Sequence, residues 1–92
     1  MREPLDLGED HVVQFVAYEG EIAGCRIEHK KKDGTPCDGF VPWKGRSWDR
    51  SFNGNIDAWD VVSEEPLTLS PSVLCRACGD HGFVRQGKWV RA

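Results

Sequence analysis

Cysteine and histidine residues near the end of the chain have the spacing of a metal-binding knuckle. Cys75 and Cys78 are separated by two residues, and Gly79 follows directly. A tight turn of this kind aims two thiolates at one point, and glycine tolerates the left-handed backbone that comes next. His81 lies three residues after Cys78, within reach of the same ion. The segment therefore predicts half of a zinc site.

The other half of the predicted site lies upstream, at Cys25 and Cys37, which have eleven residues between them and so do not form a standard knuckle. Zinc takes four tetrahedral ligands, and structural sites prefer thiolates and imidazoles. Two ligands from 25–37 and two from 75–81 would tie the middle of the chain to its end. We predict one zinc ion bound by four of these five residues: Cys25, Cys37, Cys75, Cys78 and His81. Four thiolates, or three thiolates with His81, are both consistent with the spacing, and free thiols or disulfides are the alternatives to metal.

The two remaining histidines have a structural interpretation. His29 stands beside Lys30, Lys31 and Lys32, which is typical of a solvated loop. His11 begins an apolar run, as an edge or core histidine does. Neither is predicted as a ligand.

Short strands and turns must position these side chains. Residues 11–18 form a β-branched and aromatic run, the best strand in the sequence, and Glu19-Gly20 predicts a tight turn into a second strand at 21–28. Residues 30–36 predict a polar loop, and 53–55 a turn. Further expected elements are a short strand at 40–43, a strand or one helical turn at 58–62, and a final hairpin of 83–85 and 88–90 around Gln86-Gly87. The predicted class is a small all-β or β-dominated domain with irregular loops, stapled by a zinc-knuckle-like site.

Length and composition predict a single domain over residues 1–92 with a thin core. Ten glycines and five prolines leave little room for long helices, and a domain of this size usually needs a staple. The four tryptophans are expected mainly in the core and its rim rather than as a stacking surface. The N-terminal residues lack an apolar segment, and no run approaches membrane-spanning length. We expect a bacterial host cytoplasm, where reduced cysteines favour metal over disulfides.

Three segments resemble a group of small uncharacterised proteins encoded by bacteriophages and prophages. These segments are Phe52-Asn53-Gly54, residues 67–73 (LTLSPSV) and residues 81–87 (HGFVRQG). The resemblance covers about the last half of the chain, although Leu67 here separates Pro66 from Thr68, a proline and threonine that are adjacent in the family pattern. It implies a viral or prophage origin and favours His81 as a ligand, because that pattern has a cysteine just before its histidine. It implies no activity.

The sequence favours binding over catalysis. A zinc deaminase needs H-x-E and P-C-x-x-C, and a zincin needs H-E-x-x-H; none is present. A nucleic-acid-binding zinc module is the alternative, since residues 29–50 carry six basic and three acidic side chains and residues 76–92 carry four and one. The overall charge of -3 counts against it. We therefore predict a zinc-stabilised, non-enzymatic phage accessory protein that binds a host or phage protein.

Overall fold

Three small antiparallel sheets and one short helix make up the part of the chain that the structure describes. The computed structural model describes residues 2–92. The sheets have the strand orders β1-β2-β3-β4, β5-β6 and β7-β8-β9. The elements are β1 (Leu5–Gly8), β2 (His11–Tyr18), β3 (Glu21–Lys30), β4 (Pro36–Pro42), α1 (Ser47–Ser51), β5 (Asp60–Glu64), β6 (Leu67–Ser70), β7 (Val73–Leu74), β8 (His81–Arg85) and β9 (Lys88–Arg91).

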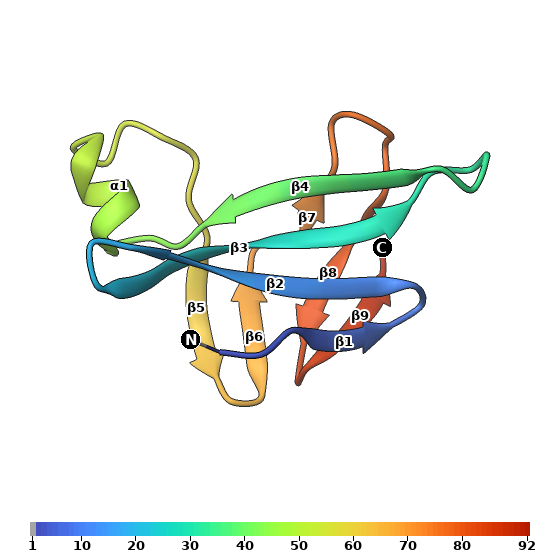
Figure 1. The fold of residues 1–92 in the computed structure, drawn as a ribbon, viewed down its shortest axis with the longest axis horizontal. Coiled ribbons are helices and arrows are strands. Elements are labelled where there is room, and N and C mark those ends of the chain that lie inside the picture. The colour runs from blue at the N-terminus through green and yellow to red at the C-terminus, as the bar shows by residue number, and fades with distance from the viewer. Residues whose placement is uncertain (1) are drawn as a thin grey trace.

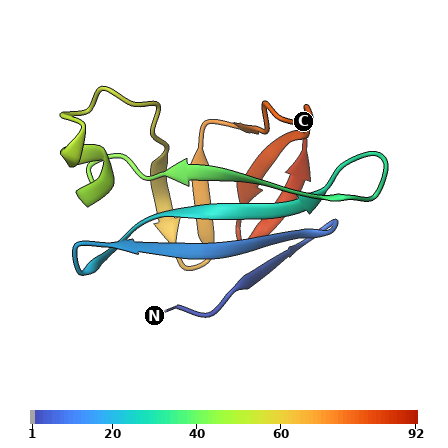
Figure 2. The same cartoon turned by 45° about the horizontal axis from the view of Figure 1, so that its top comes forward.

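The four-stranded sheet forms one layer, and the two smaller sheets run crosswise on one of its faces (Figures 1 and 2). Side chains alternate between the two faces of a strand. On β2 this alternation buries His11, Val13 and Phe15, and on β3 it buries Cys25, Ile27 and His29. These positions face the second layer, whose contribution to the core is Leu67, Leu69, Val73, Val84 and Trp89.

Most expected elements are confirmed, with shifted bounds. The strand at 11–18 and the turn at Glu19-Gly20 are as predicted, and both turn residues have positive φ (51° and 80°). The second strand continues to Lys30, and the strand expected at 40–43 is the end of the longer β4. Residues 58–62 contain the start of strand β5, not a helical turn. The final hairpin is present around Gln86 (φ 52°) and Gly87 (φ 72°).

Four elements, β1, β6, β7 and the helix α1, are not evident from the sequence. These elements have two to five residues each, too short to show a periodicity of their own. The five-residue α1 is also far too short to cross a bilayer, and no other helix in residues 2–92 could do so.

The tryptophans lie in the core and its rim. Trp43 is fully buried and Trp89 nearly so, while Trp59 packs against the core from its edge. Trp48 is half-buried on α1. The prediction that most tryptophans belong to the core and its rim is confirmed.

Candidate metal centre

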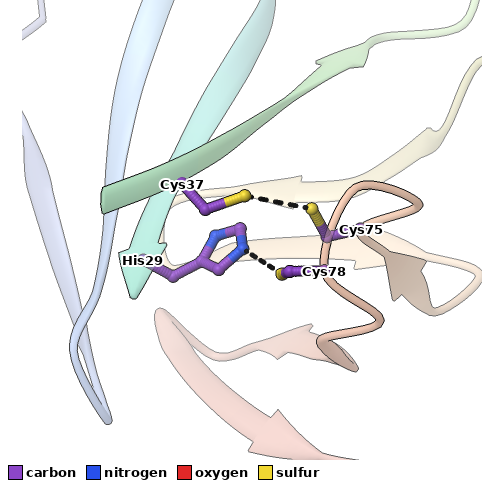
Figure 3. Close-up of side chains that lie close together, drawn as sticks. All are labelled: His29, Cys37, Cys75 and Cys78. Carbon is purple, nitrogen blue, oxygen red and sulfur yellow. Dashed lines mark hydrogen bonds between the residues drawn. The ribbon is translucent and has the colours of Figure 1, made fainter. Parts of the chain in front are cut away.

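His29 and Cys37 lie opposite each other on neighbouring strands. The β3–β4 register pairs His29 with Cys37, and Lys30 with Pro36. The loop between them closes through a hydrogen bond from the Lys31 N–H to the Thr35 carbonyl, at 2.9 Å. Because the two residues form a direct cross-strand pair on the core-facing side, both side chains project toward the second layer. Figure 3 shows them pointing at the loop that carries the remaining two cysteines.

The knuckle predicted at Cys75 and Cys78 is present. The chain turns directly after β7, and the Gly79 N–H donates to the Cys75 carbonyl at 2.7 Å. Gly79 has φ +81°, the left-handed conformation expected at this position. The Cys75 N–H donates to the Asp80 carbonyl, also at 2.7 Å, which closes the turn. Both thiols consequently face the β3–β4 hairpin (Figure 3).

The four side chains have the separations of ligands around one ion. The ligand atoms of His29, Cys37, Cys75 and Cys78 all lie within 4.8 Å of one another. The Cys37 and Cys75 Sγ atoms are 3.6 Å apart, and His29 Nε2 lies 3.2 Å from Cys78 Sγ. Two ligands on tetrahedral zinc are about 3.8 Å apart for a pair of thiolates and about 3.6 Å for a thiolate and an imidazole. The cluster can therefore hold a metal ion with little rearrangement.

A backbone hydrogen bond sets the orientation of the His29 ring. Its Nδ1 lies 3.0 Å from the Ile27 carbonyl oxygen, which is an acceptor only. Nδ1 therefore carries the proton, and Nε2 keeps its lone pair for the side facing the cysteines. Metal-binding histidines commonly have this arrangement, with the second nitrogen donating to a carbonyl.

Cys37 and Cys75 have different pKa values, because each thiol in the cluster affects the ionisation of its neighbours. Desolvation by burial would raise the pKa of Cys75. Hydrogen bonds from the Cys78 and Ala77 N–H groups and from the neighbouring thiols outweigh it, and the pKa of Cys75 falls to about 7. Desolvation, together with the proximity of Cys75 and Cys78, raises the pKa of Cys37 to about 11. Crowded thiols that cannot all ionise together are stabilised when a cation joins them.

Cys25 does not reach the cluster, although it lies on the same face of β3. It pairs with Phe15 and Val41, and it is fully buried in the core. His29 lies four positions further along the strand, a distance of about 13 Å. Desolvation raises the pKa of the Cys25 thiol to about 12, and the Trp43 indole acts in the opposite direction. The structure therefore places this predicted candidate ligand in the hydrophobic core.

His81 also lies outside the cluster. It begins β8, opposite Leu74, and its Nε2 lies 2.8 Å from the Ser72 hydroxyl oxygen. The strand alternates so that Gly82 is buried and His81 is exposed. Although His81 is close to Cys78 in sequence, the direction of its side chain therefore keeps it out of the cluster. Three of the five predicted ligands come together, and the fourth position belongs to a residue outside the predicted set.

The expectation that His29 is a solvated loop residue is wrong. The strand continues through it, and the side chain is buried, with 6 % of its surface exposed. A signal for this was present in the sequence. If residues 30–36 form the loop of a hairpin, the residues flanking that loop, 29 and 37, must face each other. The adjacent lysines obscured this signal, because they are exposed to solvent whereas His29 beside them is buried. His11, in contrast, is a buried strand residue as predicted.

Two cavities border the cluster. One, of about 540 Å³, is lined by Cys78, Asp80 and the lysines at 30–32. The other, of about 480 Å³, is lined by His29 and Cys37. Cys37 and Cys78 are themselves only half-buried, so the cluster lies near the surface.

All four cysteines are free, and the separation of the Cys37 and Cys75 sulfur atoms is well beyond a bond of about 2.05 Å. The disulfide alternative thus finds no support in this geometry.

Comparison of the chain with protein-family models, with curated proteins and with solved structures gives no match.

Proposed function

We propose that the chain binds one structural zinc ion through His29 Nε2 and the thiolates of Cys37, Cys75 and Cys78. The observation that carries the proposal is the convergence of these four ligand atoms within 4.8 Å. Three soft thiolates and one imidazole are a donor set that structural zinc prefers.

The ion would join the two layers of the fold. Two ligands come from the β3–β4 hairpin of the large sheet, and two from the loop between β7 and β8. Cys37 and Cys75 are 38 residues apart in sequence, so the ion closes a long loop. A thin core benefits most from a cross-link of this kind.

The same donor set favours a structural role over catalysis. Four protein ligands complete a tetrahedral zinc ion, whereas catalytic zinc keeps one position for water or substrate. We therefore propose that the chain is a structural scaffold rather than an enzyme.

We propose further that the scaffold binds another protein. The supporting feature is the Trp48 cluster, made of Tyr18, Phe40, Trp48 and Phe52. Ring centroids of the other three lie 5.1, 5.8 and 5.3 Å from that of Trp48. Phe40 and Phe52 are 38 % and 44 % exposed, and exposed aromatic groups are enriched in protein interfaces. A phage or host protein as the partner is consistent with the sequence resemblance.

The charge distribution supports a protein partner over nucleic acid. The nucleic-acid alternative rests on the basic residues of the segments 29–50 and 76–92. Five of them have an acidic neighbour: Lys44 with Asp60, Arg46 with Glu64, Arg50 with Glu21, Arg76 with Asp57, and Arg91 with Glu9. Each acidic neighbour repels a phosphate that the basic residue would attract.

Element analysis of the purified protein tests the metal proposal. We expect about one zinc per chain, and cobalt substitution should give the absorption bands of a tetrahedral ion with thiolate ligands. Protein that folds and melts identically with and without a strong chelator would contradict the proposal.

Pull-down from a bacterial lysate tests the interaction surface. Phe52→Ser should lose a partner that the parent captures. Val62→Ser, at an apolar residue that is 66 % exposed on β5, is the matched control and should retain it. Equal capture by both variants would contradict the assignment of the Trp48 cluster as the surface.

A further inference from the structure

A layer of aromatic and hydrogen-bonded side chains lies directly behind the ligand His29. The His11 ring stacks on the His29 ring with centroids 5.4 Å apart and an interplanar angle of 11°. It also stacks on the Trp89 indole at 4.0 Å and 10°. His11 is 3 % exposed, and nothing in the proposed ligand set explains why a polar ring is buried there.

Both nitrogens of His11 have oxygen partners. Nδ1 lies 2.6 Å from the Glu9 carbonyl oxygen, and Nε2 lies 2.5 Å from Asp80 Oδ2. Together with the stacking, these contacts fix both the position and the plane of the His11 ring. The ring is thus a rigid surface against which His29 packs.

His11, His29 and Asp80 are also close enough together to suggest a second metal site, but the geometry argues against one. Two ligands about 2.1 Å from one ion are about 3.4 Å apart in a tetrahedral site and about 3.0 Å apart in an octahedral one. The 2.5 Å between His11 Nε2 and Asp80 Oδ2 is shorter than both. This is a hydrogen bond, and the pair supports the metal site rather than forming another.

Asp80 connects this layer to the knuckle. Its carboxylate contacts His11 on β2, while its backbone carbonyl accepts the Cys75 N–H at 2.7 Å. One residue therefore holds both the ring behind His29 and the turn that carries Cys75. The two halves of the ligand set, which come from different layers of the fold, are aligned through it.

Trp89 has its place because Gly82 has no side chain. A Cβ at Gly82 would lie 2.5 Å from Trp89 Cζ2, so the indole rests on the bare backbone of β8. From this position the indole makes the second stacking contact of the His11 ring. Gly82 thus leaves room for Trp89, Trp89 packs against His11, and His11 packs against His29.

We propose that His11 is a positioning residue for the metal ligand His29, held in place by Asp80 and Trp89. The inference rests on the proposed metal site. Outer residues that orient a ligand typically contribute about 10–100-fold to metal affinity. Their loss should weaken binding without changing the ligands.

Cobalt titration of His11→Gln and Asp80→Asn tests this inference. Val13→Ala is the matched control, because Val13 is a fully buried core residue on the same strand that pairs with Leu5 and Ile27 instead of contacting the site. We expect cobalt affinity to fall about 10–100-fold in both test variants, with the absorption spectrum at saturation unchanged. Val13→Ala should melt at a lower temperature but bind cobalt almost as the parent does.

Three results would overturn the inference. If Val13→Ala loses as much affinity as His11→Gln, His11 contributes only to general stability. If the saturated spectrum changes in His11→Gln, His11 acts on the ion as a ligand. If His11→Gln does not fold, Asp80→Asn decides, and parental affinity there refutes the role. Failure of the proposed metal site itself would be recognised separately, because the unmodified protein would then show no cobalt bands.

Discussion

Replacing Cys37 by serine is the sharpest test of the ligand set, when compared with the same change at Cys25. Both cysteines lie on the core-facing side of the large sheet, and the sequence predicted both as candidates. In the structure only Cys37 lies with the other ligand atoms, while Cys25 is enclosed in the core. Cys37→Ser should therefore abolish zinc binding, and Cys25→Ser should leave one zinc per chain.

The expected loss of stability follows from the loop that the ion closes. Cys37 and Cys75 are 38 residues apart, and closing a loop of that length contributes about 4 kcal/mol in the chain-entropy description. A chain of 92 residues typically has a free energy of unfolding of about 5–14 kcal/mol. Loss of the cross-link should lower the melting temperature by about 15–30 °C. Cys25→Ser introduces a buried hydroxyl and should cost about 1–3 kcal/mol.

Zinc content by mass spectrometry and thermal unfolding by circular dichroism give both quantities on the same samples. Chelator should lower the melting temperature of the parent and of Cys25→Ser, and it should have little effect on Cys37→Ser. Full zinc content in Cys37→Ser, or zinc loss in Cys25→Ser, would refute the assignment of the ligands.

Four further outcomes are expected. His81→Ala should retain one zinc by element analysis, because its ring faces Ser72; a metal-free product would contradict this. Gly87→Val should lower the melting temperature, because residue 87 has φ 72°, and parental melting would show that the turn does not need glycine. In competition with a zinc chelator, apparent zinc affinity should fall at least about tenfold per pH unit on acidification, since the pKa of Cys37 is raised to about 11 and binding must displace its proton. The fall should steepen below about pH 7, the pKa of Cys75, and a flat profile would exclude thiolate ligands. Short DNA or RNA should bind no better than about 0.1 mM at physiological salt in a fluorescence titration, and micromolar, salt-sensitive binding would instead favour the nucleic-acid alternative.

Local patterns were sufficient for the longer elements of the fold. The β-branched run at 11–18 and the positive-φ turns at Glu19-Gly20 and Gln86-Gly87 depend on neighbouring residues only, so the sequence could predict them. The helix α1 and the strands β6 and β7 could not be predicted in this way. They depend on contacts with residues distant in sequence, as when the Ser47 hydroxyl donates to the Tyr18 carbonyl at 2.7 Å.

The candidate site likewise has one part that the local sequence predicts and another part that it does not. The sequence by itself determined the knuckle, because the Cys75–Gly79 turn is a local conformation set by spacing and by one glycine. Only the tertiary structure decided which residues complete the cluster. Strand alternation gives Cys25 and His29 the same face, and the hairpin register then selects His29 by placing it opposite Cys37. Register depends on the turn and on the packed face together, and neither is a property of one residue's neighbours. Proximity in sequence favoured His81, whereas the direction of its side chain on β8 excludes it.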